Sequence, residues 1–191
     1  AVMEKKNIGG VCLNTGCIPS KSLISSASVF SEVKRLEGMG VKTDLSGFDY
    51  GKVHGQSREA AATLSKGVQY LLEKNGVTLI KEEGKLSGTH EVTTSSGKKI
   101  QAGNIIIATG SRPRTIPGLE YDHANVCSSE DMILCDALPK SLCIIGGGAI
   151  GCEFAYIMNA FGVTVTLVEM TDHLLPNEDG EVAKALASSF K

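Results

Sequence analysis

Apolar residues recur every three or four positions over two stretches of the first half of the chain, which predicts two amphipathic helices. The first is expected over residues 19–38, where a proline suits the first turn because its missing N–H has no partner there. The second is expected over about 49–74, and Asn75-Gly76 would supply its left-handed end. Before them, the pattern predicts the end of a strand at residues 1–4 and a glycine-rich polar loop over 5–17.

The period then changes to that of short strands. Residues 77–80, 85–87 and 91–94 are each typical of a strand, and residues 95–98, Ser-Ser-Gly-Lys, are typical of a hairpin turn. This part of the chain is therefore predicted to form a small antiparallel β excursion.

The second half has the pattern of parallel sheets. Residues 104–110 form a continuous apolar run, typical of a strand buried on both faces. The two prolines within 111–118 indicate a crossing between domains. Further on, a buried strand (142–145), a helix (149–160) and a strand (163–168) follow one another, which is the order of a βαβ unit.

Composition narrows the class of partner. The 191 residues carry 19 Lys+Arg against 21 Asp+Glu, a net charge of −2, which argues against a broad electrostatic footprint for nucleic acid or an acidic membrane. With 42% hydrophobic and 21% charged residues the chain has enough apolar material for a packed core. Its longest apolar stretches are far shorter than the roughly 20 residues of a spanning helix. We therefore expect neither a nucleic-acid nor a membrane partner.

The six cysteines are too few and too unevenly spaced for a disulfide-stapled scaffold. Cys12 and Cys17, separated by four residues at the start of a predicted helix, can close a disulfide across a turn, and helix N-terminal N–H groups would stabilise a thiolate at Cys17. Equally, both could be small buried hydrophobes. The four histidines are scattered, so no metal site is expected. Of the remaining cysteines, Cys143 and Cys152 are expected in the core and Cys127 and Cys135 in loops.

A second candidate site is the glycine pattern Gly146-x-Gly148-x-x-Gly151, which follows a predicted strand and opens a helix. Such glycines let a pyrophosphate approach the helix N-terminus, and Glu169, at the end of the next strand, could accept the ribose hydroxyls. A carboxylate about 4 Å from a 2′-phosphate would repel it by roughly 4 kcal/mol per unit charge at a dielectric constant near 20, so NAD is favoured over NADP. The alternative is a glycine turn without a ligand.

Three motifs, at residues 9–21, 105–113 and 144–155, together resemble the flavin-dependent pyridine nucleotide–disulfide oxidoreductases. The dihydrolipoamide dehydrogenase branch is the most similar. Leu13, Ile18 and Ser20 look like that branch, and Glu169 agrees because the glutathione branch prefers NADP. Mercuric reductase, another disulfide reductase of the family and a non-catalytic nucleotide-binding module are the alternatives.

The resemblance implies roles for individual residues. Cys12 would be the interchange thiol that meets the substrate, and Cys17 the charge-transfer thiol beside the flavin. Lys21 would lie near the flavin with Glu153 as its ionic partner, although a surface pair is the simpler alternative. Residues implied to contact FAD are Glu4, Gly10, Lys21, Thr109 and Gly110, and those implied to contact NAD are Gly146, Gly148, Gly151 and Glu169.

The resemblance also implies an α/β fold of two Rossmann-like domains, both truncated: a partial FAD-binding domain over 1–113 and a partial NAD-binding domain over 114–191. It implies oxidation of dihydrolipoamide to lipoamide with NAD⁺, homodimerisation of the parent enzyme, and the lipoyl domain of a 2-oxoacid dehydrogenase or glycine cleavage complex as partner. The location would be the bacterial cytoplasm or the mitochondrial matrix. Because the family's N-terminal FAD loop and C-terminal dimerisation domain are not in the sequence, we expect the isolated chain to hold FAD poorly and to be inactive.

Overall fold

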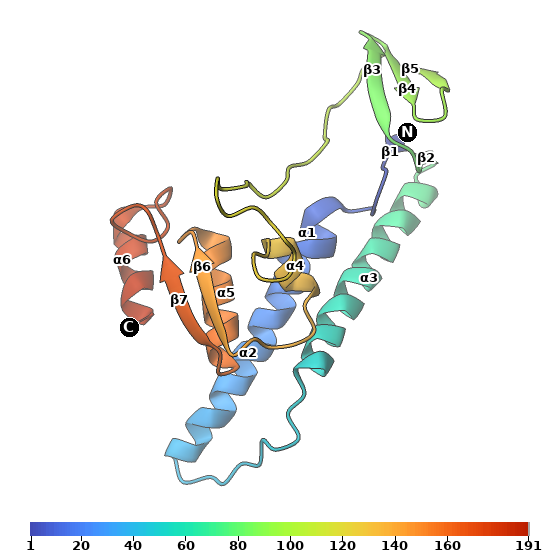
Figure 1. Ribbon diagram of the computed structural model, residues 1–191. Helices are drawn as coiled ribbons and strands as arrows, with labels where there is room; N and C mark the ends of the chain where they lie inside the picture. Colours follow the sequence, from blue (N-terminus) through green and yellow to red (C-terminus); the bar gives the residue numbers. More distant parts are fainter. Residues whose placement is uncertain (191) are drawn as a thin grey trace.

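The computed structural model describes residues 1–190 as helices joined to three small sheets (Figure 1). The helices are α1 (Gly10–Thr15), α2 (Cys17–Gly38), α3 (Tyr50–Lys74), α4 (Ser129–Leu134), α5 (Ala149–Ala160) and α6 (Gly180–Ser189). The strands are β1 (Val2–Met3), β2 (Leu79–Ile80), β3 (Gly84–Gly88), β4 (Glu91–Thr94), β5 (Lys99–Gln101), β6 (Ser141–Ile145) and β7 (Thr164–Val168).

The two long helices, α2 and α3, confirm the prediction from apolar spacing. Asp49 caps α3, its side chain accepting a hydrogen bond from the backbone N–H of Gly51 at 2.8 Å. Helix α3 ends as predicted, because Gly76 adopts a left-handed φ of 65°. The two helices pack against each other, with α1 at the N-terminal end of α2 and the 39–49 loop joining the opposite end of α2 to α3 (Figure 1).

The sheets confirm two further predictions. Strands β3, β4 and β5 form an antiparallel sheet in sequence order, which confirms the predicted β excursion for residues 85–87 and 91–94. Residues 77–80, predicted as part of it, are not, because β2 pairs in parallel with β1 instead. Strands β6 and β7 pair in parallel from Ser141↔Thr164 to Ile145↔Val168, and α5 connects them, which is the predicted βαβ unit. Strand β1 pairs in parallel with β2.

Two predictions about local structure are wrong. Residues 5–17 are not a continuous loop, because residues 10–15 form helix α1. Residues 104–110 are not a buried strand, since they have no strand assignment and the side chains of Ile106 and Ile107 are 90% and 68% exposed. A strand needs a neighbour whose N–H and C=O groups face its own. Within the described chain no strand lies alongside residues 104–110, and none of their backbone groups has a described hydrogen bond.

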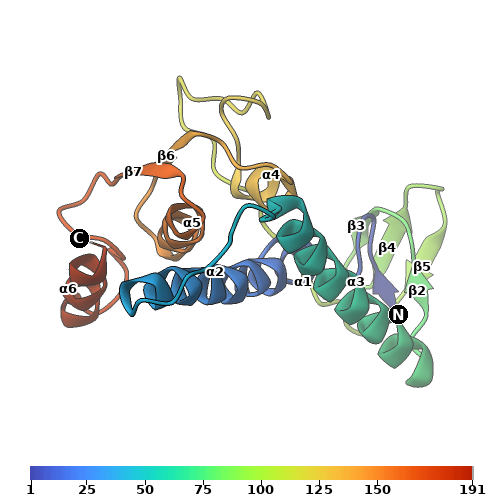
Figure 2. The ribbon, with the colours of Figure 1, turned by 90° about the horizontal axis from the view of Figure 1, so that it is seen from below.

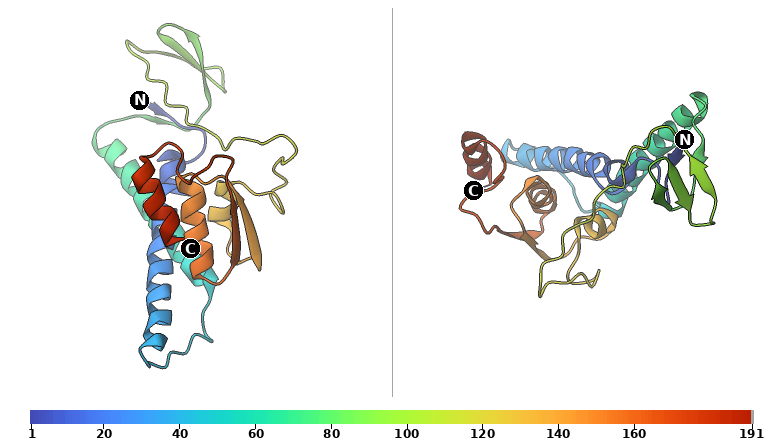
Figure 3. Two further views of the ribbon diagram at one scale, coloured as in Figure 1. Left: turned by 90° about the vertical axis from the view of Figure 1, so that its left-hand side faces the viewer. Right: turned by 90° about the horizontal axis from the view of Figure 1, so that it is seen from above.

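The core joins elements from both predicted domains. Helix α5 lies between α2 and the β6–β7 sheet (Figure 2), and four aromatic rings, those of Phe30, Phe48, Tyr50 and Phe161, pack where α2, α3 and α5 meet. Completely buried Leu23 of α2 and Ile157 of α5 belong to the same cluster. The boundary between residues 113 and 114 stays a prediction. Seen from two further sides, α6 lies beside α5 and away from the β3–β5 sheet (Figure 3). Among the described helices, none is both long enough and apolar enough to cross a bilayer.

Candidate functional site

The turn between α1 and α2 brings the two N-terminal cysteines close together. Cys12 lies within α1 and Cys17 is the first residue of α2, so only a short turn separates them. A Cβ atom added to Gly16 would lie 3.0 Å from the carbonyl oxygen of Val11 and 3.2 Å from the Cα of Cys12. Such contacts are tighter than ordinary van der Waals packing allows, so glycine is the residue that lets the chain turn back this closely.

Cys12 and Cys17 are both exposed free thiols. A side-chain hydrogen bond with Cys17 raises the pKa of the Cys12 thiol, and burial raises it further, while the charge of Lys21 opposes the change. The two thiols are therefore close enough for Cys17 to affect the protonation of Cys12. Their assignment as a redox couple stays a prediction.

Lys21 and Glu153 connect α2 to α5. Lys21 lies one helical turn beyond Cys17, and its Nζ forms an ion pair with Oε1 of Glu153. The side chains are 61% and 28% exposed. Exposed ion pairs stabilise proteins by no more than about 1 kcal/mol. The pair therefore matters for position more than for stability, because it holds the first turns of α2 beside the first turns of α5.

The glycine turn before α5 has the geometry of a dinucleotide-binding loop. Gly146 adopts a φ of 114°, which favours glycine, and Gly148 is the N-cap of α5. A Cβ atom on Gly151 would overlap the carbonyl oxygen of Gly146 and lie 3.3 Å from Cγ2 of Ile144. The turn thus packs closely against its own helix, as the third glycine of a pyrophosphate-binding turn does, and no side chain caps the helix N-terminus.

Glu169, directly after β7, closes onto this turn. Its Oε2 accepts a hydrogen bond from the backbone N–H of Gly147 at 2.6 Å, and its Oε1 accepts from the backbone N–H of Thr171 at 2.9 Å. These two hydrogen bonds, that of Thr171 first, lower the pKa of Glu169 to about 2. The carboxylate is therefore ionised at neutral pH and can only accept hydrogen bonds, which suits ribose hydroxyls and disfavours a phosphate.

We expect NAD⁺ affinity to depend on the charge of Glu169. Because its pKa in the folded chain, about 2, lies below the usual 4.5, the stabilisation by its hydrogen bonds is complete above about pH 4.5 and is lost as pH falls toward 2. Calorimetric titration should therefore give the same Kd for NAD⁺ at pH 8 and at pH 5. The Kd for NADP⁺ should be at least about tenfold higher than that for NAD⁺. Glu169→Ala should narrow the difference between the two dinucleotides. Equal wild-type affinities would contradict the assignment of Glu169.

The residues expected to bind FAD are not all brought together. Glu4 follows β1, and its carboxylate accepts a hydrogen bond from the backbone N–H of Lys6 at 2.7 Å. Gly10, with a φ of 60°, begins α1 beside the cysteines. Thr109 and Gly110 lie in the irregular segment 104–110, and no hydrogen bond within the described chain joins either of them to Glu4. The structure thus places Gly10 in the same helix as Cys12, whereas it does not join Thr109 or Gly110 to Glu4.

The other cysteines lie away from the Cys12–Cys17 pair. Cys152 is buried as predicted, and its thiol donates to the carbonyl oxygen of Gly147 at 3.4 Å; burial raises its pKa. Cys127 and Cys135 flank α4 outside the helix, also as predicted. The prediction that Cys143 is in the core is wrong: its side chain is exposed, because alternate positions of β6 face away from α5. Over residues 1–190 no three His, Cys, Asp or Glu side chains gather as metal ligands.

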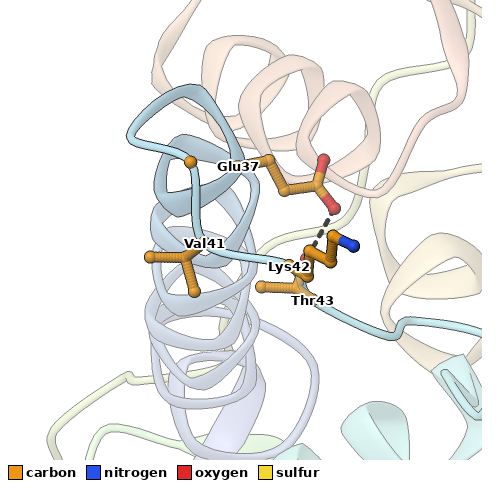
Figure 4. A pocket seen from close by; sticks show the side chains of 5 residues that line it. Glu37, Val41, Lys42 and Thr43 are labelled. Carbon is orange, nitrogen blue, oxygen red and sulfur yellow. Dashed lines mark hydrogen bonds between the residues drawn. The ribbon is translucent and has the colours of Figure 1, made fainter.

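Two surface hollows differ in their position relative to the candidate site residues. One, of about 490 Å³, lies at the C-terminal end of α2, where Thr43 donates a hydrogen bond to Glu37 at 2.5 Å (Figure 4). It is at the opposite end of α2 from the cysteines. The other, of about 350 Å³, runs along α5 and includes Glu153 and Tyr156 in its wall. Only the second therefore touches a residue of the candidate site.

Sequence reasoning missed two site residues, Gly16 and Gly147. Gly16 holds the two cysteines together, and Gly147 donates its backbone N–H to Glu169. In both cases the signal was a glycine inside a motif already selected for its other residues. What makes it necessary is a close approach in three dimensions, which the pattern of residue types does not reveal.

Known proteins resemble the chain along its whole length. It is 42% identical over 194 residues to the dihydrolipoyl dehydrogenase of Chlorobaculum tepidum and 44% identical over 198 residues to that of Corynebacterium glutamicum, in both cases covering 100% of this chain and 41% of the relative. The crystal structure of LpdA from Mycobacterium tuberculosis superimposes with a TM-score of 0.85 at 29% identity, over 99% of this chain and 42% of that one.

The matches cover all of this chain but less than half of each relative. The chain spans about two fifths of the length of the curated relatives it matches. Its mixed α/β architecture with small sheets is that of the FAD- and NAD-binding Rossmann-like fold. The sequence profile of the pyridine nucleotide-disulphide oxidoreductases matches residues 1–191, and the chain therefore belongs to that family.

Proposed function

We propose that this chain carries the cysteine couple and part of the NAD site of a flavin-dependent dihydrolipoyl dehydrogenase, which oxidises dihydrolipoamide to lipoamide and reduces NAD⁺. One observation carries the proposal. Cys12 and Cys17 are neighbouring free thiols, and Cys17 lies one helical turn before Lys21, whose partner Glu153 is on α5, the helix that the glycine turn opens. Thiol chemistry and nucleotide binding are thereby linked through one ion pair.

The cysteine couple supports thiol–disulfide exchange. A dihydrolipoamide thiolate attacks Sγ of Cys12 in the oxidised couple, the Cys12–Cys17 bond breaks, and Cys17 leaves as a thiolate. The second substrate thiolate then attacks the substrate sulfur bonded to Cys12, which closes lipoamide and releases Cys12. The couple has gained two electrons. Cys12, with its raised pKa, suits the protonated thiol, and the N–H groups at the start of α2 stabilise negative charge at Cys17.

The remaining residues hold the couple and the dinucleotide in place. Lys21 provides a positive charge beside the thiols, and Glu153 keeps that charge directed toward α5. The turn at Gly146, Gly148 and Gly151 admits the pyrophosphate, and the ionised Glu169 accepts the ribose hydroxyls.

Cys17 and Lys21, both exposed, fit the ring end of FAD, and Gly10 begins the helix that holds Cys12. When bound, FAD supplies the two-electron chemistry that connects a dithiol to a nicotinamide. Glu4, Thr109 and Gly110 would hold its adenosine and pyrophosphate, although they are not joined in residues 1–190.

The partner and compartment follow from the proposed reaction. A lipoyl domain of a 2-oxoacid dehydrogenase or glycine cleavage complex would present the dithiol, and a second copy of the enzyme would complete a homodimer. The proposed location is the bacterial cytoplasm or the mitochondrial matrix.

A chimera tests the activity. The chain replaces the matching stretch of the Chlorobaculum tepidum dihydrolipoyl dehydrogenase, with which it is 42% identical. We expect the chimera to retain FAD and to form NADH from NAD⁺ and dihydrolipoamide. A chimera that folds and binds FAD but reduces mercuric ion or another disulfide in preference to lipoamide would overturn the substrate assignment. One that folds and binds FAD without any thiol turnover would overturn the proposal as a whole.

A further inference from the structure

The loop in front of α1 is tied down by two side chains that the proposed chemistry does not use. The carbonyl oxygen of Ile8 accepts a hydrogen bond from Nδ2 of Asn14 at 2.9 Å and another from Oγ of Ser65, on α3, at 3.1 Å. Nδ2 of Asn14 also donates to the carbonyl oxygen of Gly10 at 2.8 Å. One loop is thus held both from within α1 and from a helix more than fifty residues away.

Helix α1 contacts α2, α3 and α4, but its own residues contribute little to holding it in place. It has six residues, none of them buried, and no side chain caps its N-terminus. A helix this short is marginal by itself. Its entry passes through two consecutive left-handed residues, Gly9 and Gly10, which have the largest conformational freedom of any residue type. The hydrogen bonds to Ile8 and Gly10 therefore add to the helix contacts in fixing the position of Cys12.

We propose that Asn14 and Ser65 are positioning residues that determine how readily Cys12 and Cys17 oxidise to a disulfide. The assignment rests on the proposed function in one respect, that the two cysteines are a redox couple. The hydrogen bonds exist while both thiols are free, so the chain around the cysteines is already ordered in the dithiol form. Closing the disulfide therefore costs less conformational entropy. Removing them loosens the dithiol form more than the disulfide form, which is closed covalently, and so disfavours oxidation.

The oxidation can be measured on the chain itself with a glutathione buffer. A Cys12 or Cys17 thiolate attacks glutathione disulfide, the S–S bond of the latter breaks, and one glutathione thiolate leaves. The other cysteine then displaces the second glutathione. The chain loses two electrons and two protons, and one glutathione disulfide becomes two glutathione thiols. Alkylation of the remaining thiols and peptide mass spectrometry give the fraction of the Cys12–Cys17 disulfide and hence its equilibrium constant.

Ser65→Ala is expected to lower this equilibrium constant about twofold, a fraction of the roughly fivefold that a whole hydrogen bond is worth, because only the ordering of the dithiol form is lost; Asn14→Leu, which loses two bonds, should lower it further. Ser65→Thr keeps a hydroxyl donor and should restore the wild-type value. Thr63→Ala is the matched control, because it removes an exposed hydroxyl from the same helix. A merely structural role would lower the thermal midpoint without changing the equilibrium constant.

The outcomes separate the two proposals. A wild-type chain that forms no Cys12–Cys17 disulfide at any glutathione ratio overturns the redox couple, and with it both proposals. A wild-type disulfide whose equilibrium constant is the same in Ser65→Ala, Ser65→Thr and Thr63→Ala overturns the positioning roles and leaves the couple intact. If Asn14→Leu does not fold, the three variants on α3 decide the matter.

Discussion

Replacing Cys17 by serine in the chimera is expected to abolish NADH formation from dihydrolipoamide, by a factor on the order of 10³ or more. A serine hydroxyl cannot form a disulfide with Cys12 and is a far poorer leaving group than a thiolate, so the exchange has no second step. Cys12→Ser should have an effect of the same size, because it removes the sulfur that the substrate attacks. The rate is followed by the ultraviolet absorbance of NADH at saturating NAD⁺.

Cys143→Ser is the matched control for that loss. Cys143 is likewise an exposed free thiol, but it lies on β6 on the face turned away from α5. Its replacement should leave the rate unchanged and the flavin bound. Retention of more than about a tenth of the wild-type rate by the Cys17 variant, with FAD still bound, would mean that Cys12 and Cys17 do not act as a pair.

The elements that the sequence predicts correctly are those whose signal is local. Helices α2 and α3 each have their apolar spacing within one stretch of chain, and α3 also has its capping Asp49 and its terminating Gly76 there. The short helix α4 has a comparable signal, a capping box between Ser128 and Asp131, but six residues are too few for apolar spacing to stand out. Helix α6 likewise begins at a capping aspartate, Asp179, that the apolar pattern alone does not reveal.

The elements that the sequence predicts wrongly depend on neighbours. The apolar run 104–110 has the composition of a buried strand, yet composition cannot supply the adjacent strand that would bury it. The prediction that Cys143 is buried is wrong for a related reason. The alternation along β6 tells which residues share a face of the strand but not whether another element covers that face.

The candidate site divides in the same way. The glycine pattern and Glu169 are recognisable because a strand, a turn, a helix and a second strand follow in order, and the structure joins them through the Gly147 N–H. Lys21 and Glu153 are 132 residues apart, so their ion pair could be expected only from the family resemblance. Glu4, Thr109 and Gly110 stay predictions, because their meeting would require the strand that residues 104–110 do not form.

Gly151 offers the strictest structural test of the nucleotide turn. Its hypothetical Cβ meets the carbonyl oxygen of Gly146, a backbone atom that cannot rotate away as a side chain would. The turn and the first turn of α5 would therefore have to separate to admit even one methyl group. By contrast, Gly148 has an ordinary φ of −72° and no heavy atom within 4 Å of its hypothetical Cβ.

Gly151→Ala is accordingly expected to destabilise the chain by about 1–3 kcal/mol, to lower its Tm by several degrees and to abolish NAD⁺ binding, because both packing and the pyrophosphate site are disturbed. Gly148→Ala should change stability by less than about 1 kcal/mol. It should nevertheless weaken NAD⁺ binding, since its methyl group would occupy the space that the pyrophosphate approaches. Thermal unfolding followed by circular dichroism and calorimetric titration with NAD⁺ measure both effects. An unchanged Tm in Gly151→Ala would contradict the close packing of the turn, and NAD⁺ binding of wild-type strength in either variant would show that dinucleotides do not use it.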